Sequence, residues 1–442
     1  MKNFGIYKIF GNKAGFTLTE LLVTMFILAA ILGAVFSSFI TLSRSFKMET
    51  KSTETQIENL LGLELLRYDL EMAGYGLPES SFGTTACTPV PPNTSENCSP
   101  LLSAAGVWYA EAANNTAYTA THYNYIPTRY TPDPATFNDQ PWEPRAIILS
   151  NNTNPGESTN TNDDSDVLII KSLLARRLDV NRKWTVRYNS GVNKAWSDSK
   201  WDFNSGDRMI VLSATRQLQL GSDGVTWQWM QSGASPSTSF YPTGVALPTP
   251  PPGQVYLLYG IDTSTSTTMP FNRVDYYLQR QCPGNIVSTP PLPSPTPNCS
   301  PPYPKQCHPS SYSLYRGLID PAYYGTGTGG GYIRTELPIM DCVMDFQVAL
   351  GIDIGTTGTV TWRSGTDTDT ATALKIRNNL KQVKVFILTH EGQYDPNFTY
   401  GSNTVTLGDA GITLKTYDLT RLSNWQHYRW KVVKLNIKLN SL

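Results

Sequence analysis

Residues 16–43, FTLTELLVTMFILAAILGAVFSSFITLS, form the apolar stretch that decides the fold of this 442-residue chain. No residue from Leu21 to Ser43 is charged, and these 23 residues would form about 34 Å of helix, enough to cross the hydrocarbon core of a bilayer. The preceding segment contains Lys2, Lys8 and Lys13 and no acidic residue. Because basic residues mark the cytoplasmic side of a membrane helix, we expect the bulk of the protein outside the cytoplasm.

The helical pattern continues well beyond the membrane stretch. From Phe16 to Ala73 there is no proline, and 58 helical residues would extend about 87 Å, far more than the thickness of a bilayer. Gly74 and Gly76 favour the left-handed conformation that ends helices, and Pro78 prevents the helix from resuming. The sequence therefore predicts a rod of which only the first part lies in lipid.

The second part of this rod has an amphipathic pattern. Apolar residues recur at spacings of three and four, which places them on one stripe of a helix. Charged residues occupy the rest of the helix surface. We expect a globular domain to pack on the stripe, which consists of Ile57, Leu61, Leu65, Tyr68 and Met72.

The remainder of the chain has the pattern of an antiparallel β-rich domain. Short β-branched and aromatic runs, such as 166–173, 254–261 and 382–390, alternate with clusters of Gly, Pro, Asn and Ser. The predicted fold class is α+β, with a long N-terminal helix, transmembrane and then amphipathic, packed on a large β-rich domain with long Pro-rich loops. The predicted organisation is a cytoplasmic leader (1–15), a helix that spans the membrane and mediates polymerisation (16–75) and an extracytoplasmic globular domain (76–442).

Glu20 is the unusual residue at the start of the apolar stretch. An unpaired carboxylate drawn into lipid would cost a few kcal/mol, so we expect a cation near it. The segment Gly15-Phe16-Thr17-Leu18-Thr19-Glu20-Leu21-Leu22 resembles the prepilin cleavage and methylation site of type IV pilins and type II secretion pseudopilins. The alternative is an ordinary signal-anchor helix whose glutamate lies at the membrane interface.

The resemblance implies specific roles for three residues. A prepilin peptidase would cut after Gly15, and the new amino group of Phe16 would be N-methylated. In a filament, the carboxylate of Glu20 would pair with the amino terminus of a neighbouring Phe16, so that a charge that is unfavourable alone would select the correct partner.

A second segment narrows the resemblance. Residues 65–75, LLRYDLEMAGY, resemble the end of the helix in PilW-like minor pilins, and residues 206–212 and 428–433 resemble strands of the same family. The implied function is a minor pilin that primes assembly of the pilus tip complex. The implied partners are prepilin peptidase, other minor pilins, the major pilin and the inner-membrane assembly platform. The implied location is the inner membrane, crossed once, and later the pilus or cell surface.

All six cysteines lie on the exported side of the membrane stretch, and their even number favours three disulfides. Sequence alone allows fifteen pairings, and some or all of the cysteines could instead be free buried thiols. Two pairs each flank a Pro-rich stretch that ends in Asn-Cys-Ser-Pro, so we interpret each as a loop closed on itself. The pairs are Cys87 with Cys98 and Cys282 with Cys299, which leaves Cys307 with Cys342.

Composition and motifs argue against several other functions. The 35 basic and 35 acidic residues balance, so we expect no direct binding of nucleic acid, which depends on neutralising phosphates. The four histidines are scattered, and no Cys-x-x-Cys pair is present. We therefore expect a protein that is not an enzyme, with no catalytic residue, no metal site and no cofactor.

Two other functions fit the same sequence. A J-like pseudopilin of type II secretion would share the rod, the cleavage site and a β-rich domain. A filament-tip adhesin or ligand-binding module would use the disulfide-closed loops as its contact surface.

Overall fold

The structure, a computed structural model of the chain, divides into two compact units, Met1–Glu54 and Thr55–Leu442. The described residues are 17–78, 80–81, 146–150, 165–233, 240–263, 267, 269–279, 304, 306–319, 333–353, 359–364 and 378–439.

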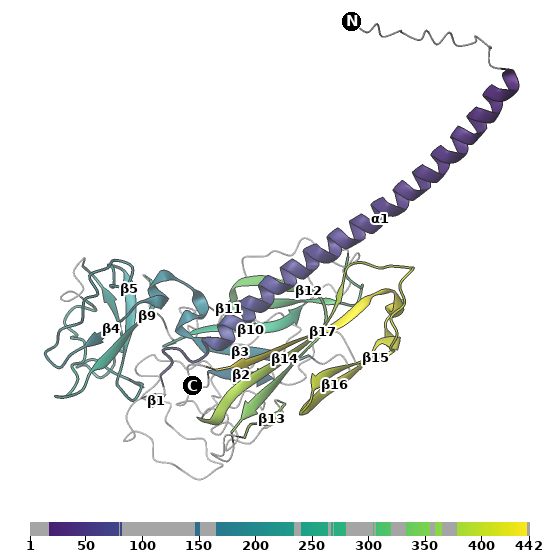
Figure 1. The fold of residues 1–442 in the computed structure, drawn as a ribbon. Helices are drawn as coiled ribbons and strands as arrows, with labels where there is room; N and C mark the ends of the chain where they lie inside the picture. The colour runs from purple at the N-terminus through teal and green to yellow at the C-terminus, as the bar shows by residue number, and fades with distance from the viewer. Residues whose placement is uncertain are drawn as a thin grey trace, which may run out of the picture. The chain divides into compact units, whose positions relative to one another are not determined.

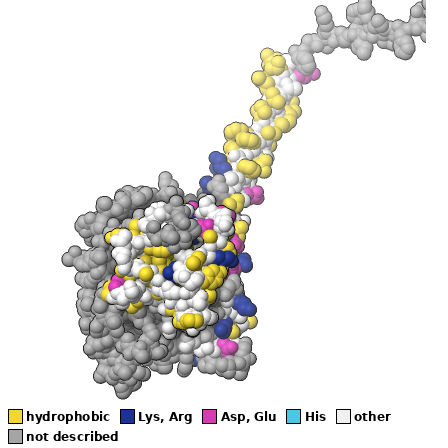
Figure 2. Space-filling model, turned by 90° about the vertical axis from the view of Figure 1, so that its left-hand side faces the viewer, with side chains coloured by type: hydrophobic (Ala, Val, Ile, Leu, Met, Phe, Trp, Pro, Cys, Tyr) yellow, Lys and Arg dark blue, Asp and Glu magenta, His cyan; other side chains and the backbone are white. Residues whose placement is uncertain are grey.

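A single helix, α1 (Leu18–Glu71), contains 54 residues and runs through the first unit into the second (Figure 1). It ends at Glu71, two residues before the predicted last helical residue Ala73, and Gly74 and Gly76 then adopt the left-handed conformation with φ of 80° and 65°. Its segment Leu18–Lys51 is long and apolar enough to cross a membrane, and the described residues contain one helix of this kind. Hydrophobic side chains cover most of the visible surface of this segment (Figure 2).

The second unit contains a large antiparallel sheet, which with α1 confirms the predicted α+β fold. Its strand order is β17-β14-β12-β11-β10-β3-β2, and β13 pairs with the end of β12 on the edge opposite β14. The core between this sheet and α1 contains Leu66 and Leu70 from the helix and many inward-facing strand residues. The bounds are β2 (Ile147–Ser150), β3 (Val167–Ser172), β10 (Asn272–Gln279), β11 (Tyr312–Ile319), β12 (Ile333–Ile352), β13 (Thr361–Arg363), β14 (Leu380–Glu391) and β17 (Arg429–Lys438).

A second sheet and a separate hairpin complete the described part of this unit. The second sheet has the order β1-β6-β5-β7-β8, with β9 between β5 and β4, and surrounds its own apolar cluster. The bounds are β1 (Ser80–Ser81), β4 (Trp184–Arg187), β5 (Asp207–Leu212), β6 (Gln217–Leu218), β7 (Gln228–Gln231), β8 (Phe240–Tyr241), β9 (Tyr256–Thr263), and for the hairpin β15 (Thr404–Asp409) and β16 (Ile412–Asp418). Short 3-10 helices are η1 (Leu173–Arg176), η2 (Asp179–Arg182), η3 (Leu419–Arg421) and η4 (Trp425–His427).

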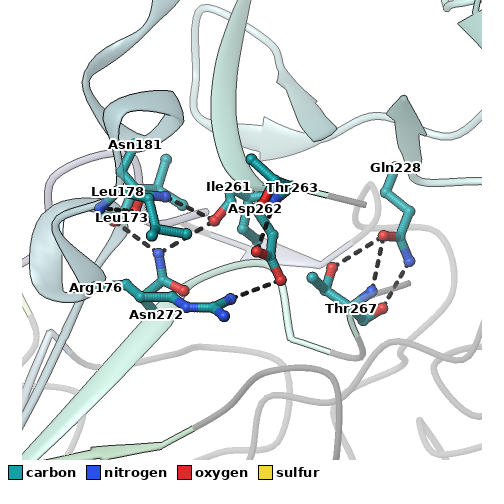
Figure 3. A network of polar contacts seen from close by, with 10 residues as sticks. All are labelled: Leu173, Arg176, Leu178, Asn181, Gln228, Ile261, Asp262, Thr263, Thr267 and Asn272. Carbon is teal, nitrogen blue, oxygen red and sulfur yellow. Dashed lines mark hydrogen bonds and ion pairs between the residues drawn. The ribbon is translucent and has the colours of Figure 1, made fainter. Parts of the chain in front are cut away.

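Buried polar contacts join the two sheets next to η1 and η2 (Figure 3). The guanidinium of Arg176 in η1 lies 2.6 Å from the carboxylate of Asp262 in β9. The amide of Asn272 in β10 donates to the carbonyl of Leu173, and the amide of Asn181 in η2 donates to the carbonyl of Ile261, each at 2.7 Å. The backbone carbonyls of Leu173 in η1 and of Ile261 in β9 are therefore satisfied by buried side-chain amides.

The apolar stripe of α1 was predicted to pack on the domain. This prediction is wrong for the first two residues of the stripe. Ile57 is 63% exposed and Leu61 is 74% exposed, and the other three stripe residues are half-buried. A neighbouring face of α1 packs on the domain instead. This face includes small and polar residues, so it is not recognised from apolar periodicity. Its buried members are Asn59, Gly62, Leu66, Asp69, Leu70 and Ala73.

Gly62 allows α1 to approach the backbone of β12. A Cβ atom added at this position would lie 1.8 Å from the carbonyl oxygen of Ile339. Since that atom belongs to the backbone of a paired strand, it cannot move aside as a side chain could. Any larger residue at position 62 would force the helix away from the sheet.

Asp69 fixes the end of α1 to the domain through three hydrogen bonds. Its Oδ2 accepts from Arg316 Nε of β11 and from Tyr276 OH of β10, each at 2.7 Å, and its Oδ1 accepts from Arg177 Nη2 at 3.1 Å. The carboxylate is fully buried. Burial raises the pKa of the Tyr276 hydroxyl well above its usual value, and Asp69 adds to this, so Tyr276 stays protonated and donates.

Replacing Asp69 tests this anchor. Asp69→Asn leaves the buried guanidinium of Arg316 without its counter-charge, so we expect the free energy of unfolding to fall by about 3–5 kcal/mol. Urea titration of the full chain in detergent, followed by tryptophan fluorescence, would measure it. The control is Glu71→Gln, which removes an exposed partner of Arg67 at 2.9 Å and should cost less than about 1 kcal/mol. Equal effects of the two substitutions would contradict the anchoring role.

Asn59 lies on the same packed face, and neither atom of its buried amide has a hydrogen-bond partner. An unsatisfied buried amide is unfavourable, so Asn59→Leu should raise the free energy of unfolding by about 1–2 kcal/mol in the same titration. The reciprocal control is Leu60→Asn on the exposed face, where we expect a change within about 0.5 kcal/mol. A loss of stability in Asn59→Leu would show that the amide has a structural role.

Candidate processing and assembly site

Thr17 and Glu20 form a reciprocal capping box at the first turn of α1. The backbone N–H and the hydroxyl of Thr17 both donate to Glu20 Oε2 at 3.0 Å, and the backbone N–H of Glu20 donates to Thr17 Oγ1 at 3.3 Å. These contacts satisfy backbone donors that have no partner within the helix. The spacing Thr-x-x-Glu is the sequence signature of this cap, although the sequence alone led us to expect a cation beside Glu20.

The cap determines where the carboxylate of Glu20 lies. It holds the side chain at the start of the helix, where the exposed N–H groups of the first turn favour a negative charge. The described hydrogen bonds involve Oε2, so Oε1 is not used by the cap. The predicted cleavage residues Gly15 and Phe16 lie outside the described residues.

The apolar surface of α1 continues past the part that lipid can cover. Ile57 lies 14 residues after Ser43, which is about 21 Å of helix. Leu60 and Leu61 follow it, and all three are more than 60% exposed. Since neither a bilayer centred on the uncharged run nor the described β domain covers these residues, they form an exposed apolar patch outside the membrane stretch.

Of the six cysteines, the structure describes Cys307 and Cys342. They form a disulfide with 4.9 Å between their Cα atoms, as expected for this pair. The disulfide joins the turn before β11 to β12. The other predicted pairs, Cys87 with Cys98 and Cys282 with Cys299, lie outside the described residues.

Two of the four histidines lie beside this disulfide in an aromatic cluster. His308 and His390 are fully buried. The ring of His390 meets Tyr428 and Trp430 edge-on, with centroids 4.8 and 5.1 Å away. His308 packs on the same tyrosine at 5.0 Å. Both rings therefore contribute to packing between β14, β17 and the turn that precedes β11.

Comparison with known proteins identifies the N-terminal segment. Residues 11–36 match the family described as the Prokaryotic N-terminal methylation motif, and this range contains Gly15, Phe16 and the capping box. No curated protein and no solved structure matches the chain. The match supports a type IV pilin-like or pseudopilin protein, and it implies processing by prepilin peptidase and association with a membrane.

Proposed function

We propose that this chain is a PilW-like minor pilin that primes assembly of the tip complex of a type IV pilus and has no enzymatic activity. The observation that carries the pilin-like part of the proposal is the match at residues 11–36, in which the one acidic residue is held at the start of an apolar helix. Prepilin peptidase cleaves after Gly15 and methylates the amino group of Phe16. The mature chain then begins one residue before the capping box.

The proposed topology follows from the distribution of charge and cysteine. Basic residues of the leader keep it in the cytoplasm, and the apolar helix crosses the inner membrane once. The second unit then lies in an oxidising compartment, which agrees with the disulfide between Cys307 and Cys342. After assembly, this unit is displayed on the pilus or the cell surface.

Glu20 has two roles in this scheme. In the isolated chain, the capping box satisfies part of its hydrogen-bonding capacity. During assembly, its negative charge pairs with the amino terminus of Phe16 on a neighbouring subunit, because an ion pair within an apolar helical bundle is far more favourable than an unpaired carboxylate. The charge therefore selects partners, and the cap holds it in place until a partner arrives.

The exposed patch of Ile57, Leu60 and Leu61 supports assembly independently of Glu20. It is apolar, it lies on a helix, and it is too far along α1 to be covered by lipid. The apolar helices of other minor pilins or of the major pilin would cover it. The inner-membrane assembly platform would deliver these partners.

The assignment as a minor pilin rests on the resemblance of residues 65–75 to the helix end of PilW-like minor pilins. Asp69 in this segment anchors the end of α1 to the domain. A J-like pseudopilin of type II secretion is the second candidate, because the matched N-terminal segment is common to both classes. Purification of the native protein with pilus components favours the minor pilin. Purification with secretion components favours the pseudopilin.

Gly15→Leu tests processing. A bulky residue at the cleavage position should leave the precursor in the membrane uncut. Mass spectrometry of the amino terminus should then find residue 1 in the variant and methylated Phe16 in the native protein. Native protein that begins at residue 1, or after the apolar helix, would contradict the proposal.

Glu20 variants separate the charge from the cap. Glu20→Gln keeps an oxygen that accepts from Thr17 but removes the charge, so we expect normal cleavage and at least a tenfold loss of incorporation into purified pili. Thr17→Val removes the side-chain part of the cap and keeps the charge, so incorporation should persist. Immunoblots of sheared pili against whole cells would measure both. Equal incorporation of Glu20→Gln and the native chain would show that the charge is not used.

A further inference from the structure

The strand β17 forms one edge of the large sheet, beside β14 (Figure 1). It pairs with β14 without a register shift over ten residues, from Arg429 to Lys438. On its other side, no strand of the described part of the chain pairs with it. An unpaired edge of this length presents a row of backbone donors and acceptors, to which an extended segment of another chain can bind.

The register shows which backbone groups of β17 point away from β14. The backbone N–H of Leu439 donates to the carbonyl of Lys381 at 3.1 Å, so these two residues form a hydrogen-bonded pair directly after the strand. Because hydrogen-bonded and non-hydrogen-bonded pairs alternate along an antiparallel ladder, the odd-numbered residues of β17 bond to β14 and the even-numbered residues point outward. No hydrogen bond joins the outward backbone groups of four residues to another described residue, namely those of Val432, Lys434, Asn436 and Lys438.

The side chains along this edge differ between the two faces of the sheet. Val433 and Leu435 are partly buried and pack against the core that contains the end of α1. The side chains of Lys434, Asn436 and Lys438 lie on the opposite face, because successive residues of a strand alternate, and all three are exposed. The edge therefore has an apolar side and a polar side, and the polar side carries two lysines.

The charge of this edge is positive. β17 contains four basic residues and no acidic residue. The first two basic residues form ion pairs with Asp395 and Glu391. The other two, Lys434 and Lys438, form no ion pair with any described residue. The second half of the strand therefore presents two cations that a bound carboxylate could neutralise.

A second copy of this chain is a poor partner for the edge. Two copies of β17 paired about Asn436 would place Lys434 of one chain opposite Lys438 of the other, and like charges directly opposite are destabilising. Lysines on an edge strand commonly prevent such self-pairing. Because the same lysines attract carboxylates, the charge favours an acidic strand from a different protein.

We propose that β17 is a docking edge for an extended acidic segment of another protein, which adds to the large sheet as one more strand. The backbone of this segment bonds to the outward N–H and C=O groups of β17. Its side chains alternate, with carboxylates on the face of Lys434 and Lys438 and apolar side chains that cover Val433 and Leu435. The backbone bonds provide affinity, and the alternation of acidic and apolar residues provides specificity. This docking edge does not depend on the proposed pilus function.

Fluorescence polarisation of a labelled peptide with the full chain in detergent tests the proposal. The probe is Thr-Glu-Val-Glu-Val-Glu-Thr, and its matched control carries a methyl group on the backbone nitrogen of each Glu. The control keeps all three charges but loses the donors that would bond to β17, so we expect it to bind at least tenfold more weakly. Equal affinity of the two peptides would indicate charge attraction without strand addition. That result, or no binding up to about 1 mM peptide, would overturn the proposal.

Variants of β17 locate the binding on this edge. Asn436→Pro removes an outward N–H and no bond to β14, so we expect the sheet to persist and peptide binding to fall at least tenfold with both lysines kept. Asn436→Thr is the matched control and should bind as the native chain does. Lys434→Gln combined with Lys438→Gln should weaken binding at least fivefold. Native affinity in Asn436→Pro would contradict the docking edge, and the methylated peptide tests it on the native chain if this variant does not fold.

Discussion

The buried carboxylate of Asp69 is the contact on which the rest of the second unit depends. It receives hydrogen bonds from β10, from β11 and from the residue after η1, so one side chain of α1 joins the helix to elements far apart in sequence. A buried carboxylate with fewer partners would be unfavourable, and here two guanidinium groups and a phenol satisfy it. Because Gly62, about two helical turns before Asp69, brings the helix against the backbone of β12, the position and rotation of this part of α1 are both defined.

Asp69 and Glu20 of α1 illustrate how the surroundings decide the use of the same chemical group. Asp69 is saturated by its own chain, so it contributes to the fold and has little capacity for a partner. Within the part of the chain that the structure describes, the contacts of the Glu20 carboxylate are those of the cap with Thr17, and Glu20 lies on an exposed helix. A charge with spare capacity in an apolar setting is suited to recognition, because a wrong partner leaves it unpaired.

The sequence predicted those features that depend on local pattern. The long helix, which ends within two residues of the predicted position, the β-rich domain and the pairing of Cys307 with Cys342 all agree with the structure. The face on which α1 packs could not be predicted from hydropathy, because its buried residues include Asn59 and Asp69. Asp69 becomes a buried residue only when Arg316 and Tyr276, more than two hundred positions away, supply its partners. The burial of Asp69 therefore depends on tertiary contacts. The capping box of Thr17 and Glu20, in contrast, can be recognised from the spacing of the two residues alone.

The exposure of Ile57, Leu60 and Leu61 follows from the same arrangement of faces. Packing through a face of small and polar residues leaves the more apolar face of α1 outward, where it is unfavourable in water. A monomer that only needed stability would place these residues inward. Their outward position is understandable if another apolar surface covers them in the working assembly. The packed face therefore serves the fold of the single chain, and the exposed apolar face is left available for association with other chains.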